Sequence, residues 1–382
     1  MLIALQFLMH SDFVTDASRQ DLVRNSPRNS MILKAVGEIF VRAVSQFCEN
    51  PTMRYRWMRY LPSGKSHLRD TFWTTLMNTI HACLQRTPVL WTRSHEKLRS
   101  IKYMRRVPQH MLDENGEPLF PDTEPEEYLA REYSAKDLDA LKYYGLRWMD
   151  IDGFLVRVRK DLNQRESSII KSPETGDDWH SRVAKILFDA WPDRAETMKS
   201  LALIPLERGQ WISASAANSV SIYYPHVNEH QIPTNLKLNL LVSEAARNRD
   251  RKRLFDRLGV QEPRVSHIRH AITIHHDSHS VTLPNNRMNL EFLYLTAHLD
   301  QDNDHPLAYR NIELYDHMHR TRLPEFHTFY FPGEDQYGAQ QLLQPVGPGK
   351  SCDSAPDLDV PYVCTVWLPA GQGKTAHRPP TG

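Results

Sequence analysis

The spacing of the apolar residues changes once along this chain, near residue 200, and this change limits the possible folds more than any other feature. Before residue 200, apolar residues recur every three or four positions, which predicts amphipathic helices. After it, short apolar runs are separated by Gly, Pro and polar residues, which predicts strands and turns mixed with helices. Because helical and strand-like segments form separate blocks instead of alternating, the sequence predicts an α+β fold.

The first half is predicted to be rich in helix. Helices are expected at 31–47 behind a Ser30 cap, from Ser66 to the residue before Pro88, over 137–162 with a break at Gly145, and over 179–190 before Pro192. Between them, a strand with a return is expected within 87–104, and an acidic loop containing Pro is expected at 113–126.

The second half is predicted to mix antiparallel hairpins with helices. In a hairpin formed by 201–205 and 210–212, Gly209 supplies the positive φ that the turn requires. Helices are expected at 243–258 and 265–274, and further strands at 220–224, 280–283, 290–295, 310–315 and 327–331. Apolar content falls after Pro332, so a disordered tail is expected over 345–382.

Two segments of the chain resemble each other. Each contains a helix end, a Gly, an aliphatic residue and an amphipathic helix, and the two glycines, Gly145 and Gly259, stand 114 residues apart. The same offset relates Val89 and Leu90 to Leu203 and Ile204. A Gly that ends a helix commonly takes the left-handed conformation, so chance similarity is one explanation. A duplication is the other, and it would place two repeat-like units near 87–160 and 201–274.

Charge and cysteine content argue against several classes of protein. Lys and Arg total 47 against 46 Asp and Glu, so no net positive field attracts nucleic acid or an anionic membrane. The four cysteines include no Cys-x-x-Cys pair, which argues against a disulfide scaffold or zinc knuckle and favours a reducing, cytoplasmic location. The apolar start has no basic leader, and no stretch approaches the roughly 20 apolar residues of a membrane helix. We therefore expect neither a signal peptide nor a nucleic-acid or membrane partner.

Two segments near the C-terminus resemble a phosphate-binding loop only in part. Gly371–Thr375 reads Gly-Gln-Gly-Lys-Thr, but Leu368 stands where such a loop requires its first Gly, and the chain continues into His-Arg-Pro-Pro instead of a helix. Gly347–Lys350 fails in a similar way. We expect this chain to bind neither ATP nor ADP.

Histidines are concentrated between His267 and His279. His267 and His270 could share a helical face, whereas His275, His276 and His279 fall where that helix should end. Zinc needs three or four converging ligands, so a polar helix end is the simpler interpretation. The alternative is a metal-dependent hydrolase that uses the His267–His279 stretch. The sequence contains no His-Glu-x-x-His and no Gly-x-Ser-x-Gly motif.

Several short motifs follow one another along about 3–343. The first is the passage over 10–14 and 17–21, with His10, Phe13, Ser18 and Arg19. The later ones are Trp179–Ser181, Ile204–Leu206 with Gly209 and Trp211, Tyr223–Pro225, Ile232–Pro233, and Leu254–Val260. In this order they resemble large fungal sacsin-like and NO VEIN-like proteins of the gyrase/histidine-kinase ATPase superfamily, and the first passage is similar to the end of their ATPase domain.

The resemblance implies a chain that begins after the ATP pocket of such a protein. The family's Asp-x-Gly-x-Gly turn and glycine-rich lid are missing, so no catalytic, cofactor-binding or metal-binding residue is carried over. The expected regions are an ATPase-like end with helices at 1–108, a helical region with the first repeat-like unit at 109–200, an α+β region with the second at 201–344, and the tail at 345–382.

The function expected from this resemblance is protein binding or scaffolding. The chain would be a non-catalytic fragment or degenerate paralogue of a chaperone-type ATPase protein, with protein clients or a larger assembly as partners and no identifiable small-molecule substrate. A gene remnant without function is a further alternative.

Overall fold

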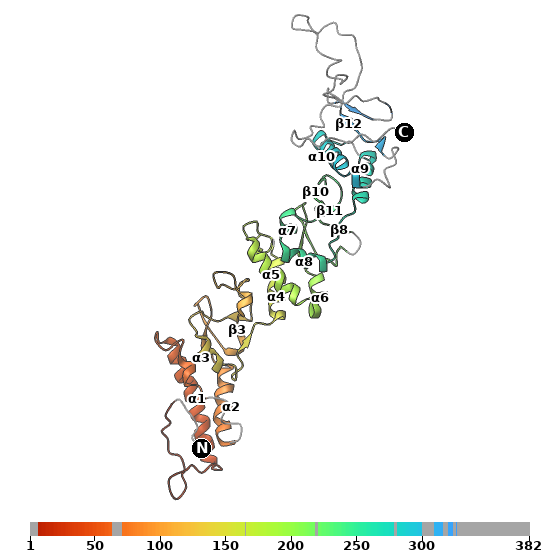
Figure 1. Ribbon diagram of the computed structural model, residues 1–382. Coiled ribbons are helices and arrows are strands. Elements are labelled where there is room, and N and C mark those ends of the chain that lie inside the picture. The colour runs from red at the N-terminus through yellow and green to blue at the C-terminus, as the bar shows by residue number, and fades with distance from the viewer. Residues whose placement is uncertain are drawn as a thin grey trace, which may run out of the picture. The chain divides into compact units, whose positions relative to one another are not determined.

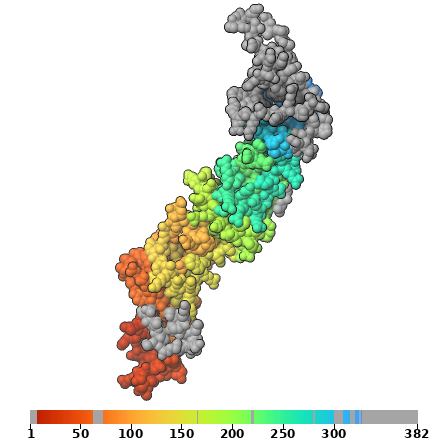
Figure 2. Space-filling view, viewed as in Figure 1, coloured from red at the N-terminus to blue at the C-terminus, as the bar shows by residue number. Residues whose placement is uncertain are grey.

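The computed structural model describes residues 7–62, 71–164, 166–217, 221–278, 281–299, 309–315, 320–323 and 326. The fold is α+β, as the sequence predicts (Figure 1). It divides into two compact units, Met1–Ala195 and Glu196–Gly382, which Figure 2 colours from red to yellow-green and from green to blue. The predicted strand at 327–331, the tail at 345–382 and both glycine-lysine segments lie outside the described residues.

The first unit opens with two packed helices, α1 (Pro27–Glu49) and α2 (Thr71–Leu84). The N-cap of α1 is Ser26, whose hydroxyl accepts from the Asn29 N–H at 3.4 Å, and not Ser30 as predicted. Pro27 explains the earlier start, because its fixed φ suits the first turn of a helix. Gly37 lets the helices approach closely, since a Cβ there would lie 2.9 Å from Thr79 Cβ.

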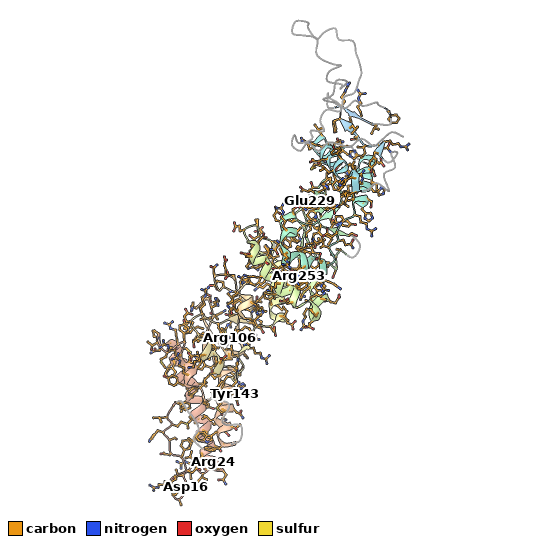
Figure 3. The ribbon with its side chains drawn as sticks, viewed as in Figure 1. Asp16, Arg24, Arg106, Tyr143, Glu229 and Arg253 are labelled. Carbon is orange, nitrogen blue, oxygen red and sulfur yellow. The ribbon has the colours of Figure 1, made fainter. Side chains whose placement is uncertain are left out.

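Short strands follow the helix pair. β1 (Leu90–Trp91) and β2 (Leu98–Arg99) form an antiparallel hairpin, and β3 (Met104–Arg106) lies between β4 (Glu127–Tyr128) and β5 (Arg147–Trp148), parallel to both. Arg106, labelled in Figure 3, lies over the Trp148 ring with Cζ 4.0 Å from its centroid and ties β3 to β5. The sequence did not reveal this parallel pairing, because two-residue strands carry no readable period.

The remaining elements of the first unit are helices. They are η1 (Trp57–Tyr60), η2 (Ile101–Tyr103), η3 (Gln109–Met111), α3 (Ala135–Ala140), α4 (Ile151–Leu162) and α5 (Asp177–Asp189), while α6 (Trp191–Lys199) contains the boundary between the units. The core gathers residues from α1, α2 and the strands, among them Leu33, Val44, Trp57, Ile80 and Leu90, each fully buried. Ile39, which the helical period places on the buried face of α1, is 61% exposed.

The second unit begins with a hairpin and continues with short strands and helices. β6 (Ile204–Pro205) and β7 (Trp211–Ile212) form the predicted hairpin, with Gly209 at φ +77°. The later elements are β8 (Ile222–Tyr223), β9 (His226–Val227), β10 (His230–Gln231), β11 (Asn239–Leu240), α7 (Ser243–Arg247), α8 (Arg249–Arg257), α9 (Val265–Ser278), α10 (Leu283–Leu295), η4 (Ala297–Leu299), β12 (Leu314–Tyr315) and β13 (Thr321–Arg322).

Four predictions for the second unit are wrong. The strands predicted at 280–283 and 290–295 are absent from those described residues, where α10 forms a helix from Leu283. The helix predicted over 243–258 is two helices, because the Asn248 side chain accepts from the N–H groups of Asp250 and Arg251, at 3.1 Å each, and starts α8 anew. The helix predicted to end at Ile274 continues to Ser278.

The two units share the same turn at a glycine. Gly145 has φ +93° and Gly259 has φ +90°. The N–H of the following residue donates to the carbonyl five residues earlier in both units, at 3.0 Å from Leu146 to Leu141 and at 3.0 Å from Val260 to Phe255. Leu146 and Val260 are both buried. The prediction of a left-handed conformation is confirmed at both glycines, and Gly259 directly follows the C-cap of α8. The prediction that Gly145 ends a helix is wrong, because α3 ends at Ala140 and Gly145 closes the turn that follows it.

The correspondence extends to neighbouring strands and helices. β6 begins 114 residues after β1, and α9 begins 114 residues after α4. β8 runs parallel to β11 and forms a parallel bridge with Gln261, as β3 runs parallel to β4 and β5. The two units therefore have the same order of hairpin, parallel strands and helices around the Gly.

Candidate binding site

The histidine-rich stretch lies on α9 and does not converge on one point. His267 and His270 are exposed, whereas His276 is 5% exposed, and His279 lies outside the described residues. Within the described part of the chain, no group of three His, Cys, Asp or Glu side chains could hold a metal ion. The polar helix end predicted for the whole stretch is therefore wrong for His276, because α9 extends far enough to bury it.

His276 joins α9 to two other segments. Its Nδ1 accepts a hydrogen bond from the Glu313 N–H at 3.2 Å, and its Nε2 lies 3.2 Å from the Asn289 side-chain amide. Burial lowers the pKa of His276 to about 4, with the neighbouring His275 adding to the effect. The ring is therefore neutral at pH 7, and its proton lies on Nε2 because Nδ1 accepts.

The proton on Nε2 requires an acceptor. Asn289 Oδ1 is buried and has no hydrogen-bond partner, and turning the Asn289 amide by 180° places it opposite Nε2. Both ring nitrogens of His276 are thus used in holding α9, α10 and 309–315 together.

Arg269 fixes the other end of α10. This buried side chain donates from Nη1 to the Leu293 carbonyl at 2.6 Å and to Thr296 Oγ1 at 3.1 Å, and from Nη2 to the Tyr309 hydroxyl at 2.7 Å. A cation at the C-terminal end of a helix is favourable because the last carbonyls carry partial negative charge. Arg269 and His276 together set the position of α10.

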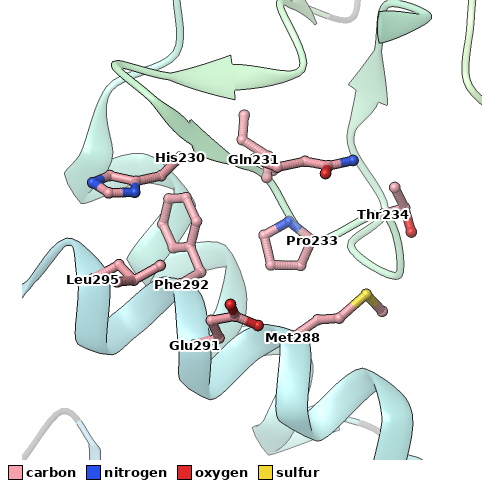
Figure 4. Close-up of a pocket in the computed structure, with 9 residues that line it drawn as sticks. His230, Gln231, Pro233, Thr234, Met288, Glu291, Phe292 and Leu295 are labelled. Carbon is pink, nitrogen blue, oxygen red and sulfur yellow. The ribbon is translucent and has the colours of Figure 1, made fainter. Parts of the chain in front are cut away.

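On its other side, α10 borders a pocket of about 220 Å³. The chain from β10 supplies one wall, with His230, Gln231, Ile232, Pro233 and Thr234. The helix supplies the other wall, with Met288, Glu291, Phe292 and Leu295 (Figure 4).

The pocket has an apolar floor and one carboxylate. Ile232, Pro233 and Phe292 are buried, while Met288 and Leu295 are 36% and 38% exposed at the rim. Figure 4 shows the Glu291 carboxylate pointing from the helix toward Pro233. An apolar hollow with few polar groups is the usual form of a ligand site.

The same end of the second unit exposes more apolar surface. Tyr294 is 59% exposed and Leu299 is 40% exposed, next to the helix turn that carries Leu295. Neither of these two side chains lines the pocket.

Buried charged groups in the first unit serve packing. Glu127 is 4% exposed and pairs with Arg99 at 2.6 Å and with Lys97 at 3.1 Å. Arg157 is 3% exposed and lies over the Tyr128 ring, with Cζ 4.8 Å from the centroid. These contacts tie β4 to the hairpin and to α4.

Cys48 and Cys83 are free cysteines. Cys48 is buried, its Sγ donates to the Val89 carbonyl at 3.1 Å, and burial raises the pKa of its thiol to about 12, so it is an unreactive core residue. Among the described residues, every helix is too short or too polar to cross a bilayer.

The sequence does not predict the pocket, because 290–295 has the pattern of a strand and the pocket wall is the helix α10. Thr282 precedes α10 and Pro284 stands in its first turn, a combination typical of a helix start, and this would have revealed the helix. No protein-family model, curated protein or solved structure matches this chain.

Proposed function

We propose that this chain binds other polypeptides through the pocket between β10 and α10. The observation that carries the proposal is an apolar hollow of about 220 Å³ whose rim residues, Met288 and Leu295, are themselves exposed. Fixed elements support such a site, since Arg269 and His276 hold α10 in place through residues that do not line the pocket. A rigid wall lowers the entropy lost on binding.

The resemblance to sacsin-like and NO VEIN-like proteins sets the context of this proposal. The chain would act as a non-catalytic fragment or degenerate paralogue of a chaperone-type ATPase protein, in binding or scaffolding. A cytoplasmic location belongs to the same proposal and is supported by the free thiols of Cys48 and Cys83.

The alternative is a metal-dependent hydrolase built on the His267–His279 stretch. Two observations weigh against it, because both ring nitrogens of His276 take part in packing and His267 and His270 lie on the exposed part of α9. A zinc titration separates the two functions. The binding proposal expects less than one equivalent of zinc and an unchanged melting temperature for His270→Ala, whereas a structural zinc would contribute to the folding free energy outright.

Panning a random peptide library against the full chain tests the proposal. Peptides should be enriched on the wild-type protein and lost on Leu295→Asp, which places a charge at the pocket rim. Ile274→Asp is the matched control, because Ile274 is 49% exposed on α9 and does not line the pocket. Equal enrichment on wild type and Leu295→Asp would contradict the proposal.

A further inference from the structure

We propose that the pocket between β10 and α10 receives an aromatic side chain of a partner protein, flanked by Lys or Arg that pairs with Glu291. This inference rests on the proposed function and specifies its ligand. The argument comes from the first unit, which has the same order of elements and fills the corresponding place with its own aromatic side chains.

In the first unit, three rings fill the space between the chain before β4 and the helices α4 and α5. Phe120 lies with its centroid 5.3 Å from Phe154 and 5.3 Å from Trp179, edge to face in both pairs. Phe120 and Phe154 are each at most 2% exposed. Edge-to-face pairs of this kind contribute about 0.5–1.5 kcal/mol beyond the area that they bury.

The second unit has smaller side chains at the matching positions. Ile232 stands seven residues before β11, as Phe120 stands seven residues before β4. Ile268 follows Phe154 by 114 residues. Both isoleucines belong to the core of the second unit, and Ile232 also lines the pocket.

The helix wall completes the comparison. Ile232 and Phe292 of α10 both line the pocket, whereas Phe120 in the first unit packs on the Trp179 indole of α5. An isoleucine thus stands where the first unit has a benzene ring. Because protein interiors are otherwise close-packed, the smaller side chain leaves room for the hollow.

The size of the pocket indicates one side chain as its occupant. Pockets for drug-sized ligands are roughly 300–1,000 Å³, and this pocket, at about 220 Å³, is smaller. An aromatic side chain on a partner peptide fits this volume, and it would restore the ring contacts that the first unit makes internally.

The charge of the pocket indicates the residues beside that ring. Glu291 is exposed, its carboxylate faces the hollow, and within the described residues no cation forms an ion pair with it (Figure 4). Glu229, labelled in Figure 3, adds an exposed carboxylate at the turn before β10. A Lys or Arg next to the aromatic residue would neutralise Glu291, whereas an acidic neighbour would be repelled.

Calorimetric titration of the full chain with three capped heptapeptides tests the inference. The probes are Gly-Ser-Lys-Trp-Lys-Ser-Gly and its versions with Ala for Trp or Glu for both Lys. We expect saturable binding of the first peptide and at least tenfold weaker binding of the other two. Glu291→Gln should remove most of the preference for Lys over Glu, while Glu244→Gln, an exposed carboxylate on α7, should leave it unchanged.

The outcomes separate this inference from the proposed function. If the library yields peptides that require Leu295 but the three heptapeptides bind equally well, the function stands and the aromatic, basic ligand is wrong. Trp367 lies outside the described residues, and Trp367→Ala removes an aromatic side chain of this chain itself. If the first heptapeptide binds to Trp367→Ala but not to the wild-type protein, the pocket is occupied by this chain's own segment, and the proposal of an external partner is wrong. If Glu291→Gln and Glu244→Gln behave alike, the role of Glu291 is wrong.

Discussion

At the scale of single residues, His276 makes stability depend on pH. Its pKa is lowered by burial to about 4, below its ordinary value of 6.5, so the unfolded chain takes up a proton between these values and the folded chain does not. Stability is therefore complete above pH 6.5 and is lost as the pH falls toward 4. The charged groups nearest in sequence are His275 and Asp277, and Glu313 is held apart because its carboxylate accepts from the Val281 N–H at 3.0 Å.

Comparing wild type with His276→Gln measures this effect. Between pH 7 and pH 4, the wild-type protein should lose about 2 kcal/mol more unfolding free energy than the variant, after allowance for solvent screening. Denaturant unfolding at each pH supplies the values. His270→Gln, on the exposed face of α9, should follow the wild type, and identical pH dependence in His276→Gln and wild type would rule out His276 as the cause.

At the scale of elements, helix ends and close helix contacts depend on glycine at particular positions. Gly259 has φ +90° and nothing within 4 Å of a built Cβ, so a substitution there meets backbone strain alone. Gly259→Val should lower the free energy of unfolding by about 1–3 kcal/mol, because a β-branched side chain is strained at positive φ. Gly259→Asn should cost less, since Asn tolerates this conformation. Equal losses for Val and Asn in thermal unfolding would contradict the strain argument.

The α1–α2 contact allows a second test at this scale. Gly37→Ala should cost about 1–3 kcal/mol, because the new Cβ would lie 2.9 Å from both Thr79 Cβ and Cγ2. Thr79→Gly removes both atoms, so the double variant should be more stable than the sum of the two single changes predicts. Strict additivity in denaturant unfolding would show that the two positions do not touch.

How far the sequence predicts these elements depends on how many faces each one buries. α1 has one buried face and a clear period, so the sequence predicts it, and the predicted cap lies four residues after Ser26, the observed one. α10 buries Leu293 in the core and Phe292 in the pocket floor, and it exposes Tyr294 and Leu295, so it has no apolar face to detect. Its short apolar run therefore has the pattern of a strand. The pocket could not be predicted, because it depends on that helix and on long-range packing.

At the scale of the whole molecule, the two units have the same order of hairpin, parallel strands and helices, but one contains an aromatic cluster and the other a pocket. The shared glycine turns and the common offset of 114 residues favour a duplication over chance, because the strands, the hydrogen bond across each Gly and the following helix agree together. The pocket of the second unit is lined by Ile232, which stands seven residues before β11, as Phe120 of the aromatic cluster stands seven residues before β4 in the first unit.

This view predicts that an aromatic side chain of the first unit can be returned to the second. Ile232→Phe places a ring where Phe120 stands in the first unit, at a position that lines the pocket, so it should raise the free energy of unfolding by about 1 kcal/mol and abolish peptide binding. Ile268→Phe is the matched control, because Ile268 is 1% exposed and does not line the pocket. Overpacking should make that variant about 1–3 kcal/mol less stable. Thermal unfolding and calorimetry of both variants decide the matter, since Ile232→Phe can stabilise the protein only if the hollow has room for the ring.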